Sequence, residues 1–343
     1  MGAALDAGAA GGMVKLERRE VVPVRIPMEG GEHEAVIVIE HDGDLQGLGE
    51  APVLAERGSS LKGLVAELSC EVPPRTPAAR CALETAALDL RARREGRPLA
   101  ELLGGWRRRE VECCALVTAG PPNLVAREVE RRAAAGFRAF KLKAAAGGGP
   151  GDQERLGAAR WAAGPGASLR LDFNGRLGAA EAAARLPSLA PFRLQFAEQP
   201  LPGDAALESW LELVQTGGIA LAADESLARP ELAEALAGAG VACAMKLGTL
   251  GGPMAVCGLA QRAHGPVTIG SSFETAIGIA AALHAACALI PEPLPCGLDT
   301  GRLLDDDLAF GPILGGSLLQ APAGPGLGLE LDRRALALYR LDR

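Results

Sequence analysis

The hydrophobic and polar positions of this 343-residue chain change their pattern near residue 112. Before it, the run "EAVIVIE" at 34–40 is short and rich in β-branched residues, which predicts a strand. The passage "GDLQGLGEAP" at 43–52 is rich in turn residues and surrounds a second possible strand. Short strands of this kind are typical of an α+β domain.

A helix is predicted in the stretch that begins "AARCALETAALDL" at residue 78. Leu83, Ala86, Ala87 and Leu90 recur at the spacing of one helix face. Arginines gather at the C-terminal end, where positive charge stabilises the helix dipole, and the glycine and proline of "REGRP" end the helix.

After Cys113 the chain repeats a short apolar strand, a turn and an alanine-rich helix. Eight strands are predicted, at residues 113–117, 138–143, 168–172, 193–197, 219–223, 242–246, 266–270 and 295–298. Strands that alternate with helices form a parallel sheet, and eight units over roughly 200 residues favour a closed β/α barrel over an open sheet. No GxGxxG motif follows the first strand, which argues against a dinucleotide-binding domain.

These patterns divide the chain into four segments. Residues 1–12 form a flexible extension, 13–112 an α+β domain and 113–310 the β/α barrel. The remaining residues, 311–343, are punctuated by glycine and proline and no longer repeat, so we expect them to leave the barrel and pack on the N-terminal domain.

Composition limits the possible partners. The net charge is −7 and the pI about 5.4, without a basic cluster, which argues against nucleic-acid binding. The first dozen residues lack a secretion signal and no long apolar run lacks breakers, so no membrane partner is expected. Eight cysteines without a CxxC pair indicate reduced, buried thiols and a cytoplasmic protein. The four histidines show no metal-ligand spacing.

Acidic residues follow three consecutive predicted strands of the barrel. Asp172, Glu198 and Asp224 are each 26 residues apart, about one strand-plus-helix unit. Active sites of barrels lie at the carboxyl ends of the strands, and neighbouring strands are about 4.8 Å apart, so three such carboxylates can converge on one Mg²⁺ or Mn²⁺. Any one of them alone is better explained as a solvated loop residue or helix cap, whereas equal spacing and flanking lysines favour a metal site.

Lysine is used sparingly: only five of the 35 basic residues are lysines. Lys141 and Lys143 lie two apart, on one face of a strand, and Lys246 ends a strand on the far side of the acidic row. A free lysine titrates near ~10.4, so a lysine base at pH 7 requires a fall of about three units, or about 4 kcal/mol. Arginine cannot serve as such a base. The alternative is an edge strand with snorkelling lysines, but lysines on both sides of a metal favour proton removal next to a carboxylate.

The chain also resembles a known family in a series of motifs. "GLGEAP" (47–52) resembles the mobile loop of a capping domain, and "ALDLRARREGRPLAELLGG" resembles the helix and turn that lead into a barrel. The motifs "FKLK", "LRLDFNG", "FAEQPL", "ADES", "MKLGTLGG" and "SSFET" follow in order. Together they resemble the enolase superfamily, its muconate-lactonising subgroup, and most closely the o-succinylbenzoate synthases. The resemblance implies a modified TIM barrel, (β/α)7β, under an α+β capping domain built from both chain ends.

The resemblance also implies roles for individual residues. Asp172, Glu198 and Asp224 would hold one Mg²⁺, with Lys143 as the base and Lys246 as a cation on the opposite face. Lys141 would help Lys143 to lose its proton, and Asn174 and Glu225 would support the site. The residues implied in substrate binding are Arg170, Gly248, Ser271 and Ser272.

The reaction implied is a syn dehydration of 2-succinyl-6-hydroxy-2,4-cyclohexadiene-1-carboxylate to 2-succinylbenzoate, in menaquinone biosynthesis. The partner would be this small-molecule carboxylate, received by hydroxyl and backbone N–H groups. Alternatively, Arg170 faces a helix and "SSFET" only caps one.

Three other functions share these residues. A dipeptide epimerase or N-acylamino acid racemase would use Lys143 and Lys246 as two bases, but the epimerases resemble one another in a D-x-D pair, and "GLDTG" has Gly297 at the first position. A metal-free aldolase would form a Schiff base on one of these lysines. A silent barrel would only bind a ligand. The departure at Gly297 favours the synthase, and the sequence does not determine the oligomeric state.

Overall fold

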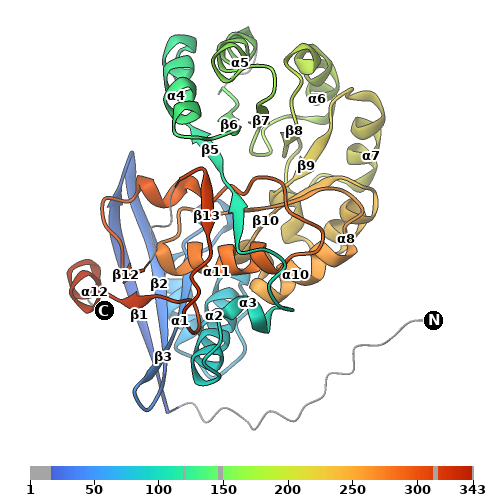
Figure 1. Ribbon diagram of the computed structural model, residues 1–343. Helices are drawn as coiled ribbons and strands as arrows, with labels where there is room; N and C mark the ends of the chain where they lie inside the picture. The colour runs from blue at the N-terminus through green and yellow to red at the C-terminus, as the bar shows by residue number, and fades with distance from the viewer. Residues whose placement is uncertain (1–16, 119, 146–149, 312–315, 342–343) are drawn as a thin grey trace.

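The computed structural model describes residues 17–118, 120–145, 150–311 and 316–341. The extension expected at residues 1–12 lies outside these ranges. Two sheets form the framework, an antiparallel sheet of three strands near the N-terminus and a parallel sheet of seven strands (Figure 1).

The N-terminal sheet has the order β1-β2-β3, with β1 Arg18–Met28, β2 Gly31–Asp42 and β3 Leu45–Pro52. The strand predicted at 34–40 is therefore confirmed. The prediction that "GLGEAP" is a mobile loop is wrong, because residues 47–52 lie within β3. The glycines serve close packing, since a Cβ added at Gly49 would lie 1.9 Å from the backbone oxygen of Ala82.

Three helices accompany this sheet: α1 Leu61–Leu68, α2 Pro77–Arg94 and α3 Leu99–Leu102. The long helix α2 confirms the predicted helix, and its residues Ala82, Ala86 and Leu90 are buried. The predicted face was partly wrong: Leu83 is only half-buried and Ala87 is exposed. The buried face is rotated toward Ala82 because small residues allow the helix backbone to approach β3 closely.

The parallel sheet contains the strands predicted for the barrel, in sequential order from β5 to β11. They are β5 Cys114–Val117, β6 Ala139–Lys143, β7 Ser168–Asp172, β8 Phe196–Glu198, β9 Leu221–Ala223, β10 Ala242–Lys246 and β11 Val267–Gly270. The helices that follow them are α4 Pro122–Ala134, α5 Pro150–Ala163, α6 Ala179–Arg185, α7 Leu207–Thr216, α8 Pro230–Gly238, α10 Pro253–Arg262 and α11 Ala276–Ala288, with the short α9 Leu247–Leu250 after β10.

The eighth predicted strand, at 295–298, is not a continuous strand. Only Cys296 and Gly297 pair, through isolated parallel bridges to Cys113 and Gly270. This segment therefore lies between β11 and the start of β5 and closes the sheet. The result confirms the modified barrel (β/α)7β, with two bridging residues in place of a regular last strand.

The end of the chain returns to the earlier elements. Strand β13 Leu318–Gln320 pairs with β4 Glu110–Glu112, and β12 Ala309–Phe310 pairs with β14 Glu330–Leu331. Helix α12 Arg333–Tyr339 lies beside β1, and the backbone N–H of Leu341 donates to the oxygen of Pro23. The domain boundaries at 13, 113 and 311 stay predictions.

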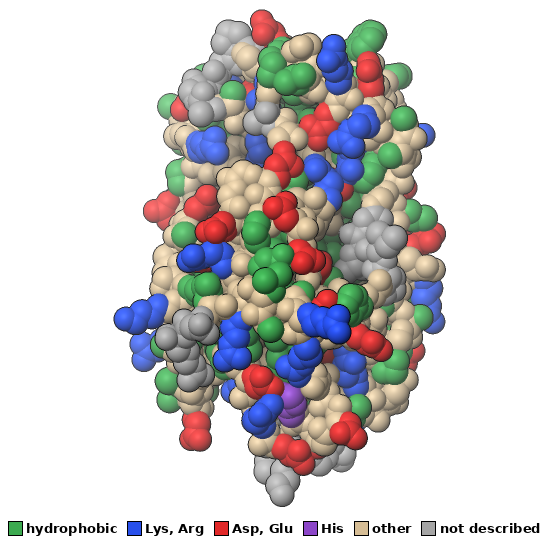
Figure 2. Space-filling view, turned by 90° about the vertical axis from the view of Figure 1, so that its left-hand side faces the viewer, with side chains coloured by type: hydrophobic (Ala, Val, Ile, Leu, Met, Phe, Trp, Pro, Cys, Tyr) green, Lys and Arg blue, Asp and Glu red, His purple; other side chains and the backbone are tan. Residues whose placement is uncertain are grey.

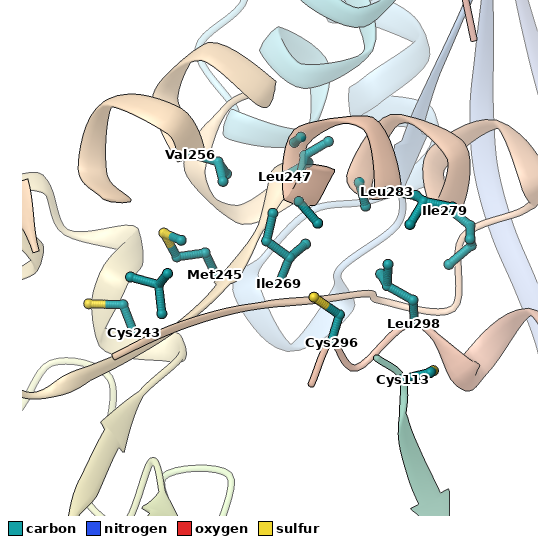
Figure 3. Packing of buried hydrophobic residues seen from close by; sticks show 14 of the residues in the cluster. Cys113, Cys243, Met245, Leu247, Val256, Ile269, Ile279, Leu283, Cys296 and Leu298 are labelled. Carbon is teal, nitrogen blue, oxygen red and sulfur yellow. The ribbon is translucent and has the colours of Figure 1, made fainter. Parts of the chain in front are cut away.

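The core lies between the barrel sheet and its helices. Met245 of β10 and Ile269 of β11 are fully buried and lie in the layer that Val256 of α10 and Leu283 of α11 also occupy (Figure 3). All eight cysteines are free, and seven are buried as predicted, whereas Cys70 is exposed.

On the surface in Figure 2, acidic and basic side chains of the described residues are interspersed. Across the described ranges, each helix is too short or too polar to cross a membrane.

Candidate functional site

A cavity of about 660 Å³ lies at the carboxyl ends of the barrel strands. Of the predicted site residues, those that line it are Lys141, Lys143, Arg170, Asn174, Glu198, Glu225, Lys246, Ser271 and Ser272. The other wall comes from the N-terminal domain, with Met28 at the end of β1 and residues 53–57 after β3. The cavity is therefore shared by elements that are far apart in the sequence.

Strand alternation explains why the charged residues face the cavity. In β6, Phe140 and Leu142 are buried in the outer core, whereas Lys141 and Lys143 point to the inside of the barrel. The register pairs Lys143 with Asp172 of β7, and Asp172 in turn with Glu198 of β8. The structure therefore confirms that the two lysines share one face.

The acidic residues form a buried row beside the lysines. The Nζ atom of Lys141 lies 2.8 Å from an oxygen of Asp172 and 2.7 Å from an oxygen of Glu198. The Nζ atom of Lys143 lies 2.7 Å from the same Asp172 oxygen. Asp172 itself is buried and does not line the cavity.

The row continues to the other side of the barrel. Asp224 follows β9, and its carboxylate lies 2.7 Å from Nζ of Lys246 on β10. The other oxygen is 3.4 Å from Nη2 of Arg57, which comes from the N-terminal domain. Since β7, β8 and β9 lie between β6 and β10, Lys143 and Lys246 approach the acidic row from opposite sides.

The charges of the site shift one another's pKa values. Burial alone would raise the pKa of Asp172, but Lys141 and Lys143 hold it below its ordinary value. Burial raises the pKa of Glu198, and the neighbouring acids Asp172 and Asp224 add to that rise. Burial opposes the charge of Lys141, yet the surrounding carboxylates raise its pKa. The row of acidic residues therefore stabilises positively charged groups beside it.

Within the described ranges, no three His, Cys, Asp or Glu side chains stand in an arrangement that could hold a metal ion as they are. The carboxylates point to lysine ammonium groups instead. Their chemistry nevertheless suits a hard divalent cation, because all donors are oxygens. Asp172 and Glu198 already share one positive group, Nζ of Lys141, so they are close enough for one cation.

Asn174 connects several members of the site. Its Oδ1 accepts a hydrogen bond of 2.9 Å from Lys143, and its Nδ2 donates to Glu225 over 3.3 Å. Its backbone N–H donates to Asp172 over 2.8 Å, which the left-handed φ of +48° allows. The structure thus brings Asn174 and Glu225 beside Lys143.

Arg170 faces the barrel interior, so the alternative in which it faces a helix is wrong. It pairs in register with Lys141, and its guanidinium lies 4.7 Å from the ring centre of Phe196. Its Nε donates to Gln195 over 2.7 Å, whereas its buried Nη2 has no partner among the described residues. That group is available for an acceptor in the cavity.

The remaining predicted residues divide into two groups. Ser271 donates to the oxygen of Gly297 over 2.9 Å, and both serines of "SSFET" line the cavity, while Thr275 caps α11. Gly248 does not line the cavity; it packs against Pro52 of the N-terminal sheet. The motif "MKLGTLGG", which contains Gly248, therefore lies at a contact between the two domains.

Sequence reasoning missed Gln199, although "FAEQPL" contains it. Its Oε1 accepts from the backbone N–H groups of Asp224 and Ser226, at 2.8 and 3.1 Å. Its Nε2 donates to the oxygen of Leu201 and to Oγ of Ser226. This buried amide fixes the loop that carries Asp224. A glutamine directly after a strand-end acid in an apolar run was the available signal.

Sequence reasoning also missed Arg57, because nothing in its local sequence indicates that it contacts Asp224, 167 residues later in the chain.

Comparison with known proteins places this geometry in a family. Residues 124–335 match the family described as enolase C-terminal domain-like. The chain is 35 % identical to an o-succinylbenzoate synthase of Thermobifida fusca over 58 % of its own length, and the match spans 62 % of that synthase. It is 31 % identical to muconate cycloisomerase 1 of Rhodococcus opacus over 84 % of its length and 79 % of the relative.

Solved structures agree in fold. The muconate lactonizing enzyme of Pseudomonas putida has a TM-score of 0.87 at 26 % identity, with 95 % of this chain and 99 % of that chain covered. A dipeptide epimerase of Enterococcus faecalis has a TM-score of 0.84 at 25 % identity, with 92 % and 99 % covered. From the family match and the conserved architecture, the chain belongs to the enolase superfamily and is similar to its muconate-lactonising members and o-succinylbenzoate synthases.

Proposed function

We propose that the protein is an o-succinylbenzoate synthase, which dehydrates 2-succinyl-6-hydroxy-2,4-cyclohexadiene-1-carboxylate to 2-succinylbenzoate. The observation that carries this proposal is the placement of Lys143 and Lys246 on opposite sides of one acidic row, at the floor of a cavity of about 660 Å³. The sequence similarity to synthases supports the choice of substrate.

Asp172, Glu198 and Asp224 would hold Mg²⁺, with Mn²⁺ as a substitute. The bound ion would supply a Lewis acid that stabilises negative charge on the substrate carboxylate as the neighbouring carbon loses its proton. Asp172 would then be shared between the ion and Lys143, whose Nζ lies 2.7 Å from its carboxylate.

Lys143 would take the proton from carbon and then return it to the departing hydroxide, which makes the elimination syn. Asn174 would keep the amine aimed into the cavity through its bond of 2.9 Å. Lys246, held by Asp224, would remain a cation and stabilise the charge on the opposite face of the substrate. Lys141 would stay paired with Glu198.

The substrate carries a second carboxylate in its succinyl group. Arg170, whose Nη2 has no partner among the described residues, and Ser272 line the same cavity and offer hydrogen-bond donors for it, whereas the hydroxyl of Ser271 already donates to the oxygen of Gly297.

The hydrogen bonds of Asp299 argue against a dipeptide epimerase activity. This acid of "GLDTG" lines the cavity, but its carboxylate already accepts hydrogen bonds from Arg132 and Arg302, and from the backbone N–H of Leu116. Gly297 supplies no second carboxylate. A substrate ammonium group would therefore find its expected acidic partner already neutralised, which favours a substrate without an amine.

The deciding experiment incubates the purified protein with the cyclohexadiene substrate and Mg²⁺ and follows the aromatic product by ultraviolet absorbance. Lys143→Arg should keep the fold but lower turnover by roughly 10²–10⁴-fold, because a guanidinium cannot act as the base. Lys62→Arg, at an exposed position of α1, is the matched control and should be fully active. Full turnover by Lys143→Arg would show that the base is wrongly assigned. Turnover of a dipeptide or muconate in place of the cyclohexadiene would overturn the proposed substrate.

A further inference from the structure

Helix α11 connects the barrel to the N-terminal domain. Eleven of its thirteen residues are buried, and it contacts both α3 and β3. Of the loop before it, residues 271–275, the first three residues form part of the cavity wall. The position of this wall therefore depends on how the start of α11 is held.

The first backbone N–H groups of α11 all have acceptors. Those of Thr275 and Gly278 donate to the carboxylate of Glu50, at distances of 3.1 Å. Asp307 accepts from Ala276 at 3.0 Å, and the hydroxyl of Thr275 accepts from Ile277 at 3.3 Å. Two of the four groups that a helix start normally leaves free are thus bound by one side chain of β3.

Glu50 is specialised for this contact. It is buried, and besides the two backbone groups it binds the hydroxyl of Thr275 at 2.7 Å and Nε2 of His33 at 3.0 Å. A Cβ added at Gly278 would lie 3.1 Å from Oε2 of Glu50. The absence of a side chain there lets the carboxylate reach the helix backbone.

The loop that precedes this contact is strained. Phe273 has a φ of +67°, a left-handed conformation that an aromatic residue adopts only when its surroundings enforce it. Its side chain is partly exposed and lines the cavity. On one side of it the backbone N–H of Ser272 donates to the carboxylate of Glu274, and on the other side Thr275 is bound by Glu50.

We propose that Glu50 is a positioning residue that holds the 271–275 loop from the N-terminal domain, so that Ser271, Ser272 and Phe273 face the substrate. Glu50 does not line the main cavity, so it acts through the residues that it binds, which are the loop before α11 and His33 of the cavity wall. The expected effect on KM rests on the proposed function, whereas the expected effect on hydrogen–deuterium exchange of the loop does not.

Glu50→Gln tests the contact with little change in size. The amide replaces one acceptor oxygen by a donor, so that Thr275, Gly278 and His33 compete for the oxygen that remains. Hydrogen–deuterium exchange should become faster in the peptide that covers residues 271–278. In the active enzyme KM should rise about tenfold, as expected for the loss of one or two buried hydrogen bonds, with a smaller change in kcat.

The matched control is Glu40→Gln. Glu40 is a buried carboxylate of the same sheet, but its partner is Arg19 and it has no contact with α11. This variant should leave exchange in 271–278 and KM unchanged.

Equal effects of Glu50→Gln and Glu40→Gln on the loop would overturn the proposal, as would unchanged exchange in Glu50→Gln. If Glu50→Gln does not fold, Thr275→Val removes the bond of 2.7 Å and should accelerate exchange in the same peptide to a smaller extent. A wild-type protein that lacks synthase activity would contradict the proposed function, while the exchange measurements would still decide the role of Glu50.

Discussion

Buried His284 predicts a specific loss of stability in acid. It lies on α11 and is fully buried. Its Nδ1 accepts from the backbone N–H of Ala100 and its Nε2 donates to the oxygen of Leu327, both at 3.3 Å. The neutral ring satisfies both bonds, whereas a protonated ring would place a second N–H against that of Ala100. Burial accordingly lowers the pKa of His284 to about 4, from an ordinary value of 6.5.

This lowered pKa sets the pH range and the size of the effect. Below pH 6.5 the unfolded chain binds a proton at this histidine that the folded protein does not bind until about pH 4. The stabilising contribution is therefore fully present above pH 6.5 and is lost as the pH falls toward 4. The total is about 3 kcal/mol of unfolding free energy, and about 2 kcal/mol is lost between pH 8 and pH 5.

His284→Gln isolates this contribution, because glutamine keeps one donor and one acceptor but does not titrate. Urea unfolding of both proteins at pH 8, 6 and 5 gives the difference in unfolding free energy at each pH, in which the other titrating groups cancel. The variant should gain about 2 kcal/mol relative to the wild type between pH 8 and pH 5. Parallel pH profiles of the two proteins would refute the reasoning.

Two further predictions concern packing and the metal. Gly49→Ala should destabilise the protein by about 3 kcal/mol in urea unfolding, because its Cβ would meet the backbone of α2, whereas Gly238→Ala, with open space around it, should cost nothing. EDTA should abolish turnover and added Mg²⁺ should restore it and raise the melting temperature, an effect that Glu198→Gln should weaken. Full turnover in EDTA would contradict the metal assignment.

Much of the barrel could be predicted because its signals are local. A strand that ends in "FKLK" shows by alternation alone that Lys141 and Lys143 share a face. The equal spacing of Asp172, Glu198 and Asp224 indicates neighbouring strand ends, because each β/α unit has a similar length. Predictions fail where the reason for a residue is not local. The resemblance predicts a mobile loop at "GLGEAP", whereas its glycines lie in β3 and make room for α2.

The candidate site shows the same division. The sequence by itself indicated most of the barrel residues that line the cavity, since strand period and strand order follow from the chain, although Asp172, Asp224 and Gly248 do not line it. Only the tertiary structure decided how they are paired and what reaches them from the other domain. Arg57 meets Asp224 across 167 residues and Glu50 meets Thr275 across 225. Such contacts depend on how the surfaces of the two domains dock, and no periodic pattern along the chain encodes that docking.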